Sequence, residues 1–255
     1  MTAAGLPQTL WIARHGQSAG NVARDAAEAA GHTVIDIATR DIDVPLSELG
    51  RRQSESLGHW FGALAAPQRP QIVLCSPYVR AAETAHLVLE SGGIAAAVKL
   101  RVDERLREKE FGILDRLTVL GIQQKYPELY EQRNHVGKFY FRPPGGESWC
   151  DVILRLRSLL EMMTREYAGR RILVIAHQVI VNCMRYLIEE MNEAQILGLD
   201  RLGDVPNCGL TSYRASLKED GEEAMELDLS NFVAPLLQEG TPVTSAPDVP
   251  AAAKP

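Results

Sequence analysis

The sequence predicts an α/β protein: a three-layer αβα sandwich whose central sheet is mostly parallel, with an antiparallel strand or hairpin at its edge. Short apolar segments alternate along the chain with longer amphipathic ones, the pattern of a sheet that is covered by helices on both faces. Near the end of the chain, two segments alternate apolar and polar residues on either side of a turn sequence, which is typical of an antiparallel hairpin.

Four short apolar segments are expected to form the main strands of the sheet. They cover residues 9–13, 72–75, 98–102 and 172–176. The hairpin is predicted from residues 210–215 and 224–229, which flank the turn residues Glu219-Asp220-Gly221. One sheet can therefore account for all the strands.

Helix starts between these strands carry capping signals. Ser47 is expected to cap a helix over 47–64, and Ser76-Pro77 combines an N-cap residue with proline at the first helical position. Ser148 with Asp151 resembles a capping box that opens a helix running to about residue 167, and a last helix should follow His177.

Composition favours one soluble domain over residues 1–237. Residues 238–255 are rich in Pro, Ala, Thr and Ser, which predicts a disordered tail. Residues 22–45 form a longish connection, whose length raises the hypothesis of a lid over a site.

The net charge of −6 argues against nucleic acid or an anionic membrane as the main partner. No apolar stretch approaches the ~18 residues of a membrane span, and no secretory signal is visible. Four scattered cysteines fit no zinc or redox motif, so we expect a reduced, cytoplasmic protein.

The first strand ends in residues that are suited to phosphate chemistry, at the position where open α/β sheets bind ligands: Arg14-His15-Gly16. A neutral imidazole such as His15 is a competent nucleophile near neutral pH, because its unperturbed pKa is about 6.5. Arg14 can donate two hydrogen bonds to phosphate oxygens, and Gly16 allows the backbone to approach a ligand closely. Asn21 adds a neutral donor one helical turn later.

Other predicted strand ends supply three further residues of this kind. Arg80 lies in the first turn of a helix, where the dipole also favours anions. Glu108 can protonate a leaving oxygen if its carboxyl group holds a proton, although Glu104 and Glu110 meet the same local criteria. His177 can stabilise the charge that develops during transfer. Because these strand ends share one edge of the sheet, we expect the side chains to converge.

In this order the motifs resemble the histidine phosphatase superfamily, also called the phosphoglycerate mutase-like family, from Leu10 to about Tyr213. The resemblance rests on Arg14-His15-Gly16 with Asn21, Pro45-Leu46-Ser47 with Gly50 and Gln53, Ser76-Pro77 with Arg80-Ala81 and Glu83-Thr84, Leu106 with Glu108 and Gly112, Gly146-Glu147-Ser148, and Ala176-His177.

The resemblance implies that His15 becomes phosphorylated, within a pocket formed by Arg14, Arg80 and His177. It also implies that Glu108 protonates the leaving oxygen and later activates water. No metal or other cofactor is expected, because these cations take the place that magnesium often fills in phosphoryl transfer.

A second set of residues resembles the fructose-2,6-bisphosphatase branch: Tyr126-Pro127, Arg133, Lys138, Arg142, Gly146-Glu147-Ser148 and His177-Gln178. By that resemblance Tyr126, Arg142 and Gln178 contact the sugar or its second phosphate. That branch has a lysine where Gly145 stands and an arginine where Asn182 stands, so two cations are missing here. We therefore predict a metal-independent phosphatase that hydrolyses a small phosphorylated metabolite, such as a sugar phosphate or bisphosphate.

Two other functions stay open at this point. A cofactor-dependent phosphoglycerate mutase resembles the chain at the catalytic core, but usually carries a longer insertion with an arginine pair before the second histidine. Residues 114–144 lack adjacent arginines. The other alternative is a non-catalytic phospho-ligand sensor or protein-binding scaffold on the same fold, although every core catalytic position holds the expected residue type.

Overall fold

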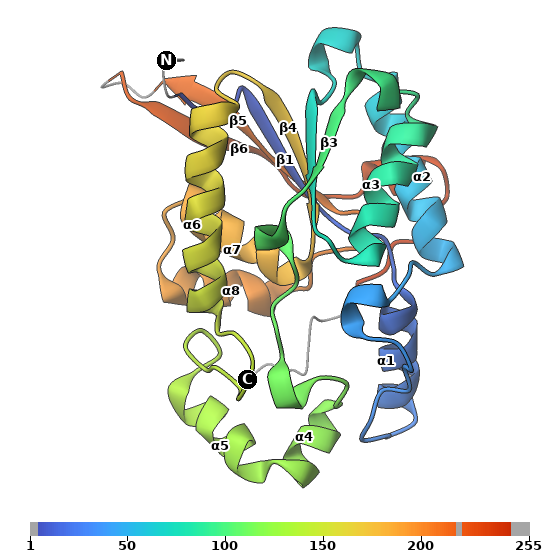
Figure 1. Ribbon diagram of the computed structural model, residues 1–255, viewed down its shortest axis with the longest axis vertical. Coiled ribbons are helices and arrows are strands. Elements are labelled where there is room, and N and C mark those ends of the chain that lie inside the picture. The colour runs from blue at the N-terminus through green and yellow to red at the C-terminus, as the bar shows by residue number, and fades with distance from the viewer. Residues whose placement is uncertain (1–4, 218–220, 246–255) are drawn as a thin grey trace.

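The central sheet has six strands in the computed structural model, which describes residues 5–217 and 221–245 (Figure 1). The strands are β1 (Thr9–Arg14), β2 (Ile72–Cys75), β3 (Lys99–Val102), β4 (Arg171–Ala176), β5 (Leu210–Leu217) and β6 (Glu223–Phe232), in the order β3-β2-β4-β1-β5-β6. The first four are parallel, whereas β5 runs antiparallel to β1 and pairs with β6. This confirms the predicted sandwich with its hairpin at the edge. Two of the predicted turn residues lie outside the described residues.

Helices cover both faces of the sheet. On one face lie α2 (Glu48–Ala63) and α3 (Val79–Ser91), and on the other lie α6 (Trp149–Glu166) and α7 (Gln178–Ile188) (Figure 1). The side chains of β1 alternate between two core clusters: Leu10 and Ile12 pack towards α6 and α7, while Trp11 and Ala13 pack towards α2 and α3. Burial on both faces explains why β1, β2 and β4 read as largely continuous apolar segments, whereas the edge strand β3 is mostly exposed.

The other helices fill the ends and edges of the sandwich. They are α1 (Ala19–Ala29), α4 (Val119–Lys125), α5 (Pro127–Val136), α8 (Glu193–Leu202) and α9 (Ala234–Gln238), with short 3₁₀ helices at Asp41–Asp43 (η1), Ala66–Gln68, Ala95–Ala97, Glu104–Leu106 and Gly112–Leu114. In Figure 1, α1, α4 and α5 lie beyond the carboxyl ends of the parallel strands. No helix in the described part of the chain is long and apolar enough to cross a membrane.

Two of the three predicted helix caps are confirmed. Ser47 accepts a hydrogen bond from the Gly50 amide, and Ser148 forms a capping box with Asp151. The prediction for Ser76 is wrong, because α3 begins at Val79. Instead, the Ser76 hydroxyl accepts from the amide of Tyr78 and contacts the ring of His177.

The folded chain continues beyond the boundary at 237 that the composition predicted. The Gln53 side-chain amide donates to the Pro242 carbonyl at 2.9 Å, and the Thr241 and Ser56 hydroxyls are 2.8 Å apart. The Asn207 amide donates to the Thr244 carbonyl at 2.8 Å. These partners lie on α2 and in the loop before β5, so local composition gave no sign of them. Residues 246–255 of the predicted tail lie outside the described residues.

Candidate active site

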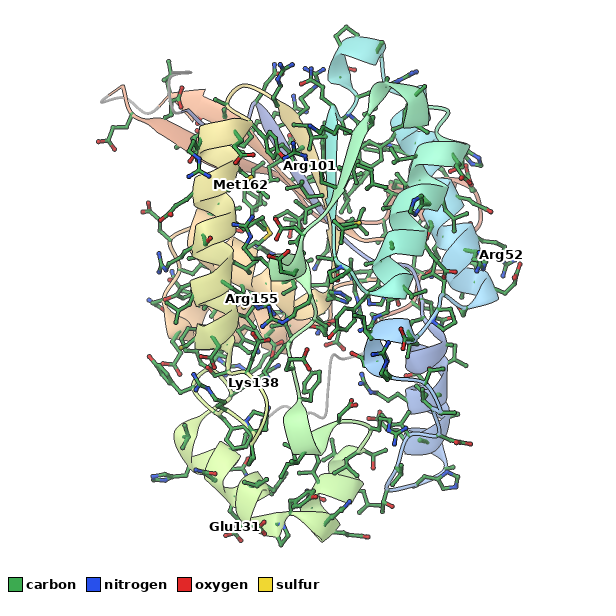
Figure 2. All side chains as sticks on the ribbon, viewed as in Figure 1. Arg52, Arg101, Glu131, Lys138, Arg155 and Met162 are labelled. Atoms are coloured by element: carbon green, nitrogen blue, oxygen red, sulfur yellow. The ribbon has the colours of Figure 1, made fainter. Side chains whose placement is uncertain are left out.

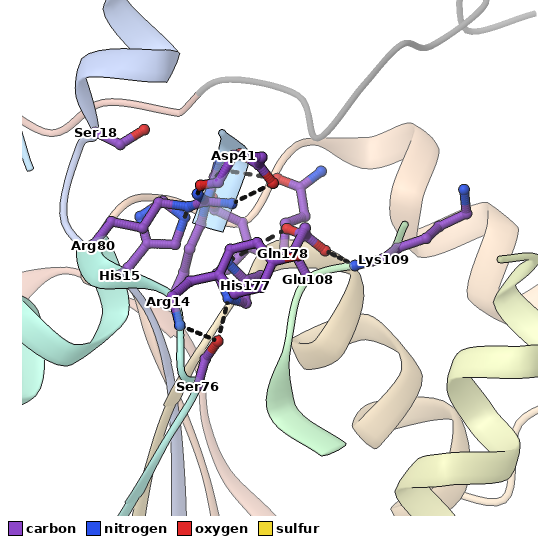
Figure 3. Close-up of polar contacts among 12 residues, drawn as sticks. Arg14, His15, Ser18, Asp41, Ser76, Arg80, Glu108, Lys109, His177 and Gln178 are labelled. Atoms are coloured by element: carbon purple, nitrogen blue, oxygen red, sulfur yellow. Dashed lines mark hydrogen bonds and ion pairs between the residues drawn. The ribbon is translucent and has the colours of Figure 1, made fainter. Parts of the chain in front are cut away.

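Side chains from three strand ends and one helix start converge at the carboxyl edge of the sheet (Figure 3). His15 and His177 follow β1 and β4, and their ring centroids are 5.1 Å apart. Arg80, in the first turn of α3, donates from Nε to His15 Nε2 at 3.3 Å. Glu108 lies after β3, and its Oε2 is 3.6 Å from His177 Nδ1. All four side chains are buried.

His15 is held as a neutral imidazole with a defined tautomer. Its Nδ1 lies 2.7 Å from the Gly16 carbonyl oxygen, which can only accept, so Nδ1 carries the proton. The other nitrogen, Nε2, then presents its lone pair towards Arg80. Burial, followed by the charges of Arg80 and Arg14, holds the pKa of His15 well below its usual value. At neutral pH the ring is therefore a neutral imidazole whose Nε2 carries no proton.

Arg14 supports the same edge from a fully buried position. Its Nη1 donates to the Val205 carbonyl at 2.7 Å and to Gln178 Oε1 at 3.0 Å. Val205 and Asn207 belong to the loop between α8 and β5, and Asn207 Nδ2 donates to the His15 carbonyl at 3.0 Å. Sequence reasoning missed this loop, because its residues follow no strand of the parallel set.

The structure distinguishes Glu108 from its two sequence competitors. Glu104 and Glu110 are exposed, and Glu110 accepts a hydrogen bond from the Tyr78 hydroxyl. Glu108 is buried beside His177, and its Oε1 accepts from the Lys109 amide at 2.7 Å. The carboxyl group therefore faces the two histidines from the side opposite to Arg80 (Figure 3).

His177 is fully buried between Ser76 and Glu108. Its Nε2 is 2.8 Å from the Ser76 hydroxyl, which itself accepts from the Tyr78 amide at 3.2 Å. Burial is the largest cause that holds the pKa of His177 well below its usual value, and the charge of Arg80 is the next. Because the Ser76 hydroxyl can donate to Nε2, Nδ1 can carry the proton on the side that faces Glu108.

Arg155 fixes the segment that carries Glu108, and sequence reasoning missed it. It reaches inward from α6 (Figure 2), where its guanidinium donates to the carbonyls of Arg105 and Glu108 and to the Glu147 carboxylate. It lies on the same helical face as Val152 and Leu156, which are buried in the core. A charged residue on an apolar helix face was the signal that could have identified it.

A small cavity of about 60 Å³ opens at these residues. Its lining includes His15, Arg80 and Glu108, together with Asn21 from α1. The Asn21 side-chain oxygen closes the capping box with Ser18, so its NH₂ group is the part that can donate to a ligand. Arg24, Asp115 and Arg116 line the same cavity but were not singled out from the sequence.

Gly16 packs closely against α2. It does not line this cavity, and a Cβ atom at this position would lie 2.3 Å from the Gly50 carbonyl oxygen of α2. The missing side chain is therefore needed for packing against α2, while the Gly16 carbonyl orients His15.

The three residues predicted from the fructose-2,6-bisphosphatase resemblance do not line the cavity either. Gln178 is buried behind Arg14 and donates to Asp204. Tyr126 packs against the small cluster that contains Leu114 and Phe141, between α4 and α5. Arg142 is exposed and pairs with Asp151 at the start of α6. All three side chains hydrogen-bond, pack or pair with other residues, and the local sequence does not indicate these partners.

The fold brings two buried histidines, an arginine and an acid together at one edge of the sheet, an arrangement that is suited to binding a phosphoryl group. A neutral histidine whose Nε2 meets an arginine, and a buried acid beside a second histidine, are groups that phosphoryl transfer through histidine can use.

The chain belongs to the histidine phosphatase superfamily (branch 1), whose family model matches residues 10–225. The match confirms the predicted family and, with it, the predicted class of enzyme, a histidine phosphatase.

Similar proteins include phosphatases and mutase-like proteins. The chain is 27% identical over 221 residues to the phosphoglycerate mutase-like protein AT74H of Arabidopsis thaliana, covering 80% of this chain and 72% of that protein. It is 31% identical over 180 residues to a 6-phosphofructo-2-kinase/fructose-2,6-bisphosphatase of Caenorhabditis elegans, covering 70% of this chain but only 34% of that protein. A mycobacterial glucosyl-3-phosphoglycerate phosphatase in complex with VO3 superposes with a TM-score of 0.65 at 25% identity, over 88% of this chain and 99% of that one.

Proposed function

We propose that this protein is a metal-independent phosphatase that hydrolyses a small phosphomonoester through a phosphohistidine on His15. The observation that carries the proposal is the geometry of His15, whose Nδ1 donates to the Gly16 carbonyl while Nε2 meets Arg80. A ring held in this tautomer needs no proton loss before it attacks phosphorus.

In the first step, His15 Nε2 forms a bond to phosphorus as the bond from phosphorus to the ester oxygen breaks. Arg80 and a His177 Nδ1–H donor neutralise charge on the transferring group. The Glu108 carboxyl group gives its proton to the leaving oxygen, so that an alcohol departs and the carboxylate remains. The products of this step are a phosphohistidine and the free alcohol.

In the second step, water replaces the alcohol. The Glu108 carboxylate takes a proton from the water as the water oxygen bonds to phosphorus and the bond to Nε2 breaks. Inorganic phosphate leaves, His15 returns to its neutral form, and Glu108 holds a proton again. One residue thus serves as acid and then as base.

The similar proteins support a phosphorylated metabolite of the sugar class as substrate. One is named a glucosyl-3-phosphoglycerate phosphatase and another a fructose-2,6-bisphosphatase. Gly145 has φ of 72°, in the left-handed region that disfavours a lysine there, and Asn182 is uncharged. We therefore infer a substrate whose non-reacting part is held differently from that of fructose 2,6-bisphosphate.

The proposal is tested by trapping the intermediate. Purified protein is mixed with sugar phosphates, sugar bisphosphates and phosphoglycerates, and inorganic phosphate release is measured beside acid-labile phosphate on His15. We expect hydrolysis with the wild-type protein and neither signal with His15→Ala. Transfer from 3- to 2-phosphoglycerate with little phosphate release would instead identify a mutase, and binding without either reaction would identify a sensor.

A further inference from the structure

Most donors of the Arg80 side chain contact acceptors of the same chain, and two of them contact the carboxylate of Asp41. Arg80 Nη1 donates to Asp41 Oδ1 at 3.0 Å and to the Asp41 backbone oxygen at 2.7 Å, and Nη2 donates to Asp41 Oδ2 at 3.2 Å (Figure 3). The Arg80 Nε donates to His15. A guanidinium has five N–H donors, so these contacts use four of them.

Two oxygens of a carboxylate on the two Nη atoms form the fork that arginine also offers to phosphate. A phosphoryl group that reaches His15 Nε2 and takes two hydrogen bonds from Arg80 therefore needs the positions that Asp41 now fills. Sharing is unfavourable, because the Asp41 carboxylate and the phosphate oxygens are both negative.

Asp41 also lies on the common wall of two cavities. It lines the catalytic cavity of about 60 Å³ and a second cavity of about 660 Å³ that lies over Tyr78, Arg107 and Glu110. Sites for small molecules usually measure roughly 300–1,000 Å³. The inner cavity is too small for a whole sugar phosphate, whereas the outer one is not.

The surroundings of Asp41 allow it to leave. The Arg80 side chain is 6% exposed, whereas the Asp41 side chain is 40% exposed. Asp41 belongs to the three-residue helix η1. The other acid of η1, Asp43, forms an ion pair with the exposed Arg40 at 2.6 Å. Movement of η1 therefore breaks few buried contacts, while Arg80 keeps its contacts with His15 and with the ring of Tyr78.

We propose that Asp41 is a built-in competitor of the phosphoryl group: its carboxylate occupies Arg80 in the unliganded protein, and the phosphoryl group displaces it on binding. Displacement frees the Arg80 donors and joins the two cavities, so that the leaving-group part of the substrate lies in the outer one. This gives the connection over residues 22–45 a specific part in ligand binding, and it rests on the proposed phosphoryl site.

Binding of inorganic phosphate tests the proposal without turnover. Isothermal titration of Asp41→Asn and Asp41→Ala should give a Kd for phosphate about two- to tenfold lower than that of the wild-type protein, because the competing charge is gone. Asp43→Asn is the matched control, since it removes an acid from the same short helix without touching Arg80, and its Kd should not change.

The opposite sign would overturn the proposal. If Asp41→Asn binds phosphate more weakly or equally well, Asp41 orients Arg80 or is a bystander. The outcome is independent of the chemistry: a protein that binds phosphate but hydrolyses nothing disproves the proposed function and leaves this inference intact. If it does hydrolyse, the KM of Asp41→Asn should fall by the same two- to tenfold factor, which a purely structural role would not produce.

Discussion

The Thr244 hydroxyl donates to Asn207 Oδ1 at 3.0 Å, and Asn207 Nδ2 in turn donates to the carbonyl oxygen of His15 at 3.0 Å. The same hydroxyl accepts from Gln53 at 2.9 Å, so its hydrogen bonds tie the segment after α9 to α2 as well. Thr244 is thus two hydrogen bonds away from the proposed nucleophile.

Replacing this hydroxyl should loosen the nucleophile. Thr244→Val keeps the shape but leaves the buried Asn207 oxygen without its donor, which typically costs about 1–3 kcal/mol. We expect a lower melting temperature together with a lower kcat. Thr241→Val, which removes only the contact with Ser56, should lower the melting temperature without the loss of kcat. Equal kcat values for the two variants would show that Thr244 does not position His15.

Glu108→Gln should impair both chemical steps to different extents. An amide can neither protonate the leaving oxygen nor take a proton from water, so hydrolysis of an alkyl phosphate should fall by about 10²- to 10⁴-fold. With p-nitrophenyl phosphate, whose leaving group needs no proton, rapid quenching should reveal accumulated phosphohistidine because only its hydrolysis is slowed. Glu110→Gln, at the exposed neighbouring acid, should retain activity. If the Glu108→Gln variant hydrolyses both substrates at the wild-type rate, Glu108 is not the general acid and base.

The sequence could predict part of the candidate site because His15 and His177 each directly follow a buried apolar strand. A strand that is buried on both faces can be recognised from its apolar composition. The carboxyl ends of parallel strands lie at one edge of the sheet regardless of the connecting loops. His15, His177 and Glu108 are close together for that reason.

The predicted residues that lie away from the cavity have partners that local sequence patterns do not indicate. The Arg142 side chain is held by its ion pair with Asp151, and the Gln178 side chain is held by a hydrogen bond from the buried Arg14. The ordered residues 241–245 depend on Gln53 and Asn207. Local pattern carries no information about such pairs. A residue-by-residue resemblance transfers identity but not orientation.

The folding stability should fall in mild acid because two histidines are buried without charge. The pKa values of His15 and His177 lie well below 6.5 in the folded protein, so below pH 6.5 the unfolded chain binds protons that the native state excludes. The free energy of unfolding is therefore constant with respect to these groups above pH 6.5. It decreases as the pH falls towards the folded pKa values, by up to about 1.4 kcal/mol per pH unit for each ring.

Urea denaturation between pH 7.5 and pH 5 measures this dependence. His15→Asn should show a shallower loss of stability than the wild-type protein, because one of the two rings no longer contributes. His135→Gln, at an exposed position of α5, should follow the wild-type curve. Identical slopes for wild type and His15→Asn would mean that burial does not hold this ring neutral.

Gly16→Ala should destabilise the fold by steric conflict and not by a change at the ligand. The added Cβ would lie 2.3 Å from the Gly50 carbonyl and 2.9 Å from the Ser54 hydroxyl, so β1 and α2 must separate. Overpacking of this kind typically costs about 1–3 kcal/mol. Gly198→Ala is the matched control, because it lies within α8 with open space around its Cβ position and should stabilise by roughly 0.5–1 kcal/mol. Thermal denaturation should therefore move the two variants in opposite directions, and a stable Gly16→Ala protein that fails only in phosphate binding would restore the ligand role predicted for Gly16.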